Sequence, residues 1–275
     1  MLRCRDRSLA LDVPAVMGIL NVTPDSFSDG GQHFTREAAI ATGLRMAGEG
    51  AAIVDVGGES TRPGAAPVGV QQEIDRVAPV LEALAARSPV LLLVDTSKPE
   101  VITAALQAGA HMVNDVRALQ VPGALAAAVA GNAAVCVMHM RGEPATMQQS
   151  PQYDDVVAEV RGFLAARLAA CRAAGLGPDS ICIDPGIGFG KDYNHNLALL
   201  RNLRRFTDLG APVLLGVSRK SLIGIMTGRP ASERLAGSVV LAGLAVQAGA
   251  TIIRAHDVAA TVDAVKVATA LRGAP

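Results

Sequence analysis

Eight short aliphatic runs recur along the chain, and they constrain the fold more than any other feature of the sequence. Runs that polar residues hardly interrupt are typical of strands covered on both faces, as in a parallel sheet. We predict strands at residues 15–20, 52–56, 90–94, 111–114, 134–138, 180–183, 213–216 and 251–254.

Amphipathic segments separate these runs. In residues 153–175 the apolar side chains fall on one stripe at helical spacing, and Gly175 supplies a stop signal. That stripe consists of Val157, Val160, Leu164, Leu168 and Cys171. The valines after the last run repeat in the same way, and Asp257 is expected to cap the helix that they predict.

Eight strand-then-helix units in a chain of 275 residues predict an α/β fold, a closed (β/α)8 TIM barrel. A doubly wound open sheet is the alternative. Linker, charge-block and low-complexity signals are missing, so we predict a single domain over residues 1–275, with its core at about 15–271. The Gly- and Pro-rich stretch 57–69 is interpreted as a strand-to-helix loop.

Composition limits the function classes. Half of the residues are hydrophobic and Trp is absent, so the core is expected to be aliphatic. Lys plus Arg equals Asp plus Glu at 25 each, which argues against a broad nucleic-acid or membrane-surface face but permits a local basic pocket.

Cysteine usage and the amino-terminal residues bear on location. The four cysteines lie far apart without zinc-finger spacing, so we expect reduced thiols rather than a zinc or disulfide framework. We find neither a convincing signal peptide nor an apolar run long enough to span a bilayer. A soluble cytoplasmic protein is therefore expected.

Polar side chains follow nearly every predicted strand. Individually each has a simpler explanation: Asp and Asn often cap the next helix, Lys220 and Arg254 could be solvated, and His139 could be structural. A closed barrel, however, brings all carboxyl-terminal strand ends around one mouth, where barrel enzymes place their chemistry. The residues are Asn21, Asp55, Asp95, Asn114, Asp115, His139, Arg141, Asp184, Ser218, Arg219, Lys220, Arg254 and His256. Together they predict a binding pocket.

The residue types indicate what this pocket binds. A carboxylate such as Asp95 or Asp184 accepts parallel N–H bonds from a flat amino-pyrimidine edge, and Asn114 offers a donor and an acceptor. Arg254 could stack on a heteroaromatic face, and with His256 and glycine-rich loops it suits a phosphate or diphosphate. A flat heterocycle that carries a diphosphate would use the whole set.

Successive segments then resemble a known family. They are "MGILNVTPDSFSDGG", "DVGGESTRPGA", "DTSKPEV", "VNDVRAL", "MHMRGEPATMQ", "DPGIGFGK", "GVSRKS" and "IIRAHDV". In this order, from about Val16 to Val258, they resemble the signatures of the bacterial dihydropteroate synthases. The resemblance implies a (β/α)8 barrel and a transferase of folate biosynthesis. It would condense 6-hydroxymethyl-7,8-dihydropterin diphosphate with 4-aminobenzoate, giving 7,8-dihydropteroate and diphosphate.

The resemblance also implies site residues. Asp95, Asn114, Asp184 and Lys220 would bind the pterin ring, with Asp95 and Lys220 as the catalytic residues. Arg254 would lie on one pterin face and reach the diphosphate with His256. Asn21 would meet a Mg²⁺ ion that rides on the diphosphate. The remaining substrate-binding residues implied are Thr61, Arg62, Pro63, Phe189 and Ser218, the last two and Pro63 around the aminobenzoate.

Further implications concern loops, chemistry and assembly. Residues 23–31, with Phe27 as an added apolar wall, and 60–65 resemble two mobile loops that close over the diphosphate. The reaction would be a dissociative substitution in which Asp95 stabilises positive character on the pterin methylene, with no strong general base. Sulfonamides would compete with 4-aminobenzoate. A homodimer through outer-ring helices is the usual family assembly.

Three rival functions are considered. A pterin-dependent methyltransferase on the same barrel has no use for residues 21–31, for Lys220 or for the diphosphate-binding residues 254–256. A non-enzymatic pterin-binding copy would lose the aminobenzoate subsite, and a sugar-phosphate isomerase needs a Glu base that does not stand out. Four residues remain without a site role: His33, Arg117, which we expect to be solvated, His139, and His195, which we expect to help start a helix.

Overall fold

The computed structural model describes residues 1–23, 35–60, 65–144 and 146–272. Eight parallel strands run in the order β8-β7-β6-β5-β4-β3-β10-β9. They are β3 (Ala15–Asn21), β4 (Ile53–Gly57), β5 (Leu91–Asp95), β6 (Met112–Asp115), β7 (Ala134–Met138), β8 (Ile181–Asp184), β9 (Leu214–Gly216) and β10 (Ile252–Ala255). Every predicted strand is confirmed, with bounds that differ by one residue at most.

The sheet closes between its first and last strands. Ile183 of β8 forms a parallel bridge with Val213, and the Ile183 N–H donates to the Pro212 carbonyl at 2.9 Å. This contact excludes the open-sheet alternative and confirms the predicted TIM barrel. The β8–β9 junction is nevertheless the weakest in the ring. It has one bridge, whereas the adjoining strand pairs β9–β10 and β7–β8 form ladders of three and four residue pairs.

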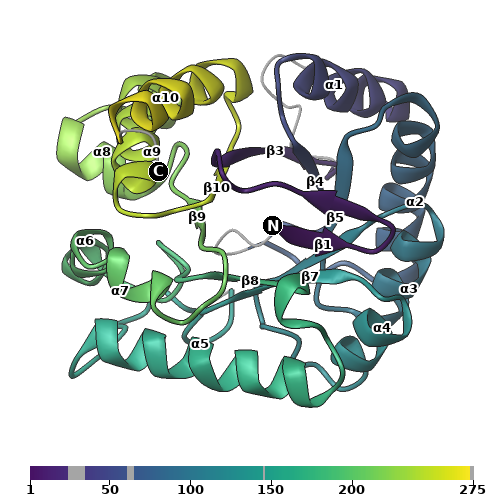
Figure 1. The fold of residues 1–275 in the computed structure, drawn as a ribbon, viewed down its shortest axis with the longest axis horizontal. Helices are drawn as coiled ribbons and strands as arrows, with labels where there is room; N and C mark the ends of the chain where they lie inside the picture. The colour runs from purple at the N-terminus through teal and green to yellow at the C-terminus, as the bar shows by residue number, and fades with distance from the viewer. Residues whose placement is uncertain (24–34, 61–64, 145, 273–275) are drawn as a thin grey trace.

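Helices surround the strands, as Figure 1 shows. They are α1 (Arg36–Gly48), α2 (Val70–Arg87), α3 (Pro99–Gln107), α4 (Ala124–Ala130), α5 (Val156–Ala173), α6 (Tyr193–Arg201), α7 (Arg204–Thr207), α8 (Ser221–Thr227), α9 (Leu235–Gln247) and α10 (Val258–Leu271). The stripe predicted for α5 is buried, and Gly175 follows the helix at φ +106°. Asp257 precedes α10 as predicted, but its side chain makes no cap hydrogen bond.

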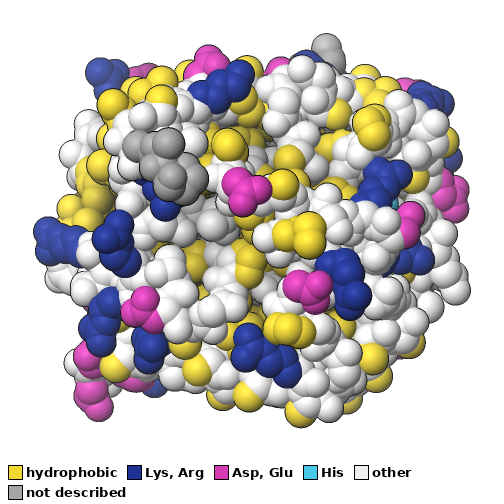
Figure 2. Space-filling view, viewed as in Figure 1, with side chains coloured by type: hydrophobic (Ala, Val, Ile, Leu, Met, Phe, Trp, Pro, Cys, Tyr) yellow, Lys and Arg dark blue, Asp and Glu magenta, His cyan; other side chains and the backbone are white. Residues whose placement is uncertain are grey.

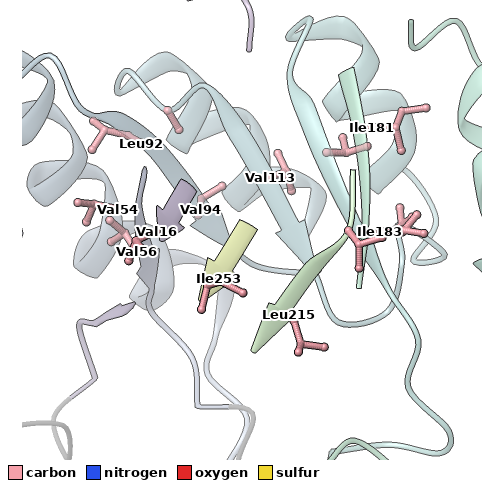
Figure 3. Packing of buried hydrophobic residues seen from close by; sticks show 14 of the residues in the cluster. Val16, Val54, Val56, Leu92, Val94, Val113, Ile181, Ile183, Leu215 and Ile253 are labelled. Atoms are coloured by element: carbon pink, nitrogen blue, oxygen red, sulfur yellow. The ribbon is translucent and has the colours of Figure 1, made fainter. Parts of the chain in front are cut away.

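Alternation along the strands divides the core into two layers. Residues such as Val16, Val54 and Leu92 face the helices in the outer layer, which Figure 3 shows in part. Their neighbours Met17 and Ile53 belong to a separate cluster inside the barrel. Burial of both faces accounts for the uninterrupted apolar runs in the sequence.

An amino-terminal hairpin was missed in the sequence. The antiparallel strands β1 (Leu2–Cys4) and β2 (Arg7–Leu9) insert Leu2 and Cys4, both fully buried, into the inner cluster. Arg5 holds the hairpin to the barrel by donating to the Leu106 and Ala110 carbonyls, each at 2.8 Å. The core was predicted to begin at residue 15, and these two side chains extend it to the chain terminus.

Other sequence expectations concern cysteines, charge and the membrane. All four cysteines are described, buried and free. Lys and Arg side chains are interspersed with Asp and Glu over the face seen in Figure 2. Among the described helices none combines the length and apolarity needed to cross a membrane.

Candidate active site

The strand register brings the predicted polar residues to one level of the barrel mouth. Asn21 of β3 pairs with Gly57 of β4, Gly57 with Asp95 of β5, and Asp95 with Asn114 of β6. Gly57 has no side chain, and a Cβ there would lie 3.7 Å from both Asn21 Oδ1 and Asp95 Cβ. The glycine therefore leaves the space between Asn21 and Asp95 open.

Arg254 joins this group from β10 through two carboxylates. Its Nε donates to Asp55 Oδ2 in a short ion pair, and its Nη2 donates to Asp95 Oδ2 at 3.0 Å. Asp55 is fully buried on β4, and the sequence analysis noted it at a strand end without giving it a role. The fork geometry of guanidinium suits such a bridge, since Arg presents several donors in one plane.

Electrostatic effects among Asp55, Asp95 and Arg254 oppose one another. Burial raises the pKa of Asp55, and Arg254 acts against that rise. Burial and the nearby Asp55 raise the pKa of Asp95, again against the effect of Arg254. Burial alone would lower the pKa of Arg254, but the carboxylates outweigh it and the pKa is raised. The guanidinium is thus a fixed cation whose removal would leave two carboxyl groups together without a counter-charge.

Lys220 and Asp184, which follow β9 and end β8, influence each other electrostatically across the mouth. Lys220 Nζ lies 4.6 Å from the centroid of the Phe189 ring and donates to the Ile187 carbonyl in a short bond. Burial lowers the pKa of Lys220 to about 8, although Asp184 opposes this shift. Asp184 accepts from the Gly186 N–H at 2.7 Å, and burial raises its pKa against the effect of Lys220.

Two acceptors in the mouth lack a hydrogen-bond partner. Among the described residues, buried side-chain atoms without a partner include Asn114 Oδ1 and Asp55 Oδ1. A buried polar atom that loses its hydrogen bond costs about 1–3 kcal/mol, so such atoms are candidates for a ligand's donors. Asn114 is 4% exposed and sits beside Asp95, where a ring N–H could reach it.

Ser218 follows β9 and His256 follows β10, and their side chains contact each other. Ser218 Oγ accepts from the His256 N–H at 3.1 Å and lies 3.0 Å from His256 Nδ1. Arg219, which lies between Ser218 and Lys220 in the chain, has a left-handed backbone at φ +58°. Its side chain forms an ion pair with Asp257, with Nε and Oδ2 3.0 Å apart. Because Arg219 turns to the exterior, Ser218 and Lys220 on either side of it can both contact groups in the mouth.

Several residues that the sequence analysis singled out have no described position. Thr61, Arg62, Pro63, Phe27 and His33 lie outside the described residues, as do most of both loops.

The other unassigned side chains have structural partners. His195 completes a capping box with Asp192 at the start of α6, which confirms its expected role. Arg117 is not simply solvated, because it pairs with Glu143. His139 is buried and contacts Lys191 Nζ at 2.9 Å. Over the described part of the chain no three His, Cys, Asp or Glu side chains gather as a metal cluster.

Comparisons with known proteins agree with this geometry. Residues 17–256 match the family described as "Pterin binding enzyme". The Dihydropteroate synthase of Escherichia coli (strain K12) is 52% identical over 263 residues, which cover 96% of this chain and 93% of that protein.

Solved structures extend the similarity to the fold. The Yersinia pestis dihydropteroate synthase with a sulfonamide drug complex has 50% identity and a TM-score of 0.95, covering 98% of each chain. The Xanthomonas albilineans dihydropteroate synthase in complex with 7,8-dihydropteroate has 52% identity and a TM-score of 0.90, covering 99% of this chain and 98% of that one. Identity of this extent, along nearly the whole length and with the same barrel, is a family relationship: the chain belongs to the pterin-binding enzymes, within the dihydropteroate synthase family.

Proposed function

We propose that this protein is a dihydropteroate synthase, which condenses 6-hydroxymethyl-7,8-dihydropterin diphosphate with 4-aminobenzoate. The observation that carries the proposal is the convergence of Asp95, Asn114, Asp184, Lys220 and Arg254 on one barrel mouth. A relative of 52% identity is described in complex with 7,8-dihydropteroate, the product of this reaction. Sulfonamides are expected to compete with 4-aminobenzoate, since a similar synthase forms a sulfonamide complex.

The pterin ring would occupy the space between β5, β6 and β8. Asn114 Oδ1, which has no hydrogen-bond partner among the described residues, would accept a ring N–H, and the Asp184 carboxylate would accept from the amino-pyrimidine edge. Arg254 would cover one face of the ring, its plane held by Asp55 and Asp95. Lys220 would turn from the Ile187 carbonyl to a ring acceptor.

The aminobenzoate would lie over Phe189. Its aromatic ring suits the Phe189 face, and its carboxylate suits the Ser218 hydroxyl and the adjoining backbone at the edge of the mouth. Lys220 lies over the same ring and so stands between the two substrates. Thr61, Arg62 and Pro63 are proposed to complete the diphosphate and aminobenzoate contacts.

A magnesium ion fits the oxygen donors present. Asn21 offers one amide oxygen beside the space left by Gly57, and the described residues include no competing cluster of three metal-ligating side chains. Mg²⁺ commonly takes one or two protein oxygens and fills its shell with water and substrate phosphates. When bound, the ion would neutralise charge on the diphosphate. Asn21 would hold it there, with Arg254 and His256 on the remaining phosphate oxygens.

Bond changes follow from these positions. The C–O bond at the pterin methylene breaks with its electron pair leaving on diphosphate, and Arg254 and His256 stabilise that charge. Asp95, held by Arg254, stabilises positive character on the carbon. The neutral aromatic amine then forms the C–N bond and releases one proton. The amine is nucleophilic without deprotonation, so no general base is assigned.

An assay of diphosphate release tests this function. We expect release and 7,8-dihydropteroate formation only when both substrates are present, with turnover falling about 100-fold or more in excess chelator and returning with Mg²⁺. Pterin diphosphate binding without turnover would instead indicate the non-enzymatic copy, and full activity in chelator would contradict the metal role. A methyltransferase would release no diphosphate.

The assembly is proposed to be a homodimer through one apolar face. Most of the large exposed hydrophobic side chains lie on three helices that neighbour one another in Figure 1, and we name this set the α8–α10 face. It consists of Ile225, Met226, Leu235, Val240, Leu244, Val267 and Leu271. Contiguous exposed apolar surface marks an interaction site, and a second copy of the chain is the proposed occupant.

Light scattering after size-exclusion chromatography tests the dimer. Val240→Glu places a carboxylate on a side chain that is 60% exposed on α9, and we expect it to convert the dimer to a monomer. Val13→Glu is the matched control, because Val13 is 57% exposed but lies outside the α8–α10 face. A monomeric wild type, or a dimer that tolerates Val240→Glu, would contradict the proposal.

The free thiols fit a reducing compartment, and a cytoplasmic location is proposed on that basis.

A further inference from the structure

The loop after β8, residues 185–191, has an unusual pattern of hydrogen bonds. Five successive backbone carbonyls, from Gly186 to Gly190, each accept from a side chain. The donors, in chain order, are Lys191 to Gly186, Lys220 to Ile187, Gln148 to Gly188, Lys191 to Phe189 and Tyr153 to Gly190. Lys191 is the donor that holds this loop at two points, on either side of Ile187 and Gly188.

Lys191 makes these bonds from inside the protein. It is 2% exposed, and its Nζ lies 2.9 Å from the Gly186 and Phe189 carbonyls and 3.2 Å from the His139 carbonyl. His139 Nδ1 is a fourth neighbour at 2.9 Å. Burial and the charge of Lys191 lower the pKa of His139 to about 3, so the ring is neutral and accepts the bond. Burial lowers the pKa of Lys191 to about 7, and the nearby Asp184 opposes this shift.

The loop needs such a restraint because of its glycines. Gly186, Gly188 and Gly190 all have left-handed φ angles, of +69°, +84° and +63°. A Cβ at Gly186 would lie 1.9 Å from the His139 carbonyl oxygen, and one at Gly190 would lie 2.2 Å from that of Arg141. Glycine is thus required for close packing against the exit of β7, but it leaves the backbone free to adopt other conformations.

We propose that Lys191 is a positioning residue that fixes Phe189 as the platform of the aminobenzoate subsite. The inference rests on the proposed function, in which Phe189 carries the second substrate. Lys220 also restrains the loop. In the proposed function, however, it turns from the Ile187 carbonyl to bind the pterin. Lys191 contacts the Phe189 main chain from inside the protein and has no proposed bond to either substrate, so its bonds need not change when substrates bind. The buried Lys191 amino group, which has four acceptors within 3.2 Å, therefore holds the platform when Lys220 turns away.

The test is Lys191→Met, which keeps the length and apolar stem but removes all donors. We expect the KM for 4-aminobenzoate and the inhibition constant of a sulfonamide to rise together by about tenfold or more, as for loss of hydrogen bonds to a charged group. The KM for pterin diphosphate should change less than threefold, about the scatter of such effects. Hydrogen–deuterium exchange should increase in residues 185–191, a readout independent of turnover.

A stability-matched control separates positioning from general destabilisation. Val80→Ala creates a small cavity under α2, across the barrel from β8, and should lower the melting temperature without changing either KM. Lys191→Gln, which retains a neutral donor, should give an intermediate KM for 4-aminobenzoate. Equal rises in both KM values, or a loss of stability with both KM values unchanged, would overturn the inference. An inactive wild type would instead refute the proposed function, while the exchange measurement would still report on the loop.

Discussion

Arg254→Gln is expected to lower kcat/KM for pterin diphosphate by about 10³-fold, the largest effect of any substitution considered. The variant loses the cation proposed to contact both the ring and the leaving diphosphate. It also leaves Asp55 and Asp95 facing each other without the guanidinium that bridges them. Breaking one partner of a buried pair costs about 3–5 kcal/mol, so the free energy of unfolding should fall as well.

A second substitution distinguishes the loss of folding from the loss of chemistry. Adding Asp55→Asn to Arg254→Gln removes one of the two unpaired carboxylates and their mutual repulsion, so it should restore much of the thermal stability, but not the activity. Arg229→Gln is the matched control, since the Arg229 side chain forms an exposed ion pair with Glu233 and its loss should leave kcat/KM unchanged. Activity that returns together with stability in the double variant would show that Arg254 has no direct part in the reaction.

Lys220→Met is expected to have the second-largest effect, a fall of about 10²-fold in kcat/KM for pterin diphosphate. It removes the ammonium that lies over the Phe189 ring and interacts electrostatically with Asp184. Both substrates should be affected, because this cation stands between their proposed subsites. Lys191→Met, by contrast, is expected to affect mainly 4-aminobenzoate, and this difference separates the two lysines.

The pH profile gives an independent check on Lys220. Its pKa is lowered to about 8 from the ordinary lysine value, so the ammonium is half lost at about pH 8 and disappears as the pH rises further. The neighbouring charges are Asp184, which favours the ammonium, and Arg254, which disfavours it. We expect kcat/KM for pterin diphosphate to fall above about pH 8 in the wild type, since this ratio reports groups of the free enzyme. The same alkaline fall in Lys220→Met would contradict the assignment.

The sequence predicted the barrel well because its strands are buried on both faces. Continuous apolar runs such as residues 90–94 have no other ready interpretation, and their polar ends followed from the geometry of closed barrels. The amino-terminal hairpin was missed, since two strands of three residues carry no readable period. Asp257 was expected to act only as a helix cap, and its ion pair with Arg219 depends on a tertiary contact that local sequence does not encode.

Within the candidate site, the residues at strand ends were easier to predict than the residues that support them. Asp55 was noticed but not assigned, because its role depends on Arg254 from a strand about 200 residues later. Lys191 had no signal beyond its place in "DPGIGFGK", since its acceptors are backbone carbonyls and carry no side-chain identity. Its restraint of the loop becomes visible only in the folded structure, where the Gly186 and Phe189 carbonyls lie against its Nζ.

The single bridge between β8 and β9 has a consequence for substrate recognition. Phe189 follows β8 and Ser218 follows β9, so the proposed aminobenzoate subsite straddles the junction where strand pairing is weakest. Main-chain pairing alone therefore constrains the width of this subsite, from Phe189 to Ser218, only loosely. Its dimensions depend instead on side chains that cross the gap, and changes in those side chains could adjust the fit of an aromatic ligand while the barrel itself stays unaltered.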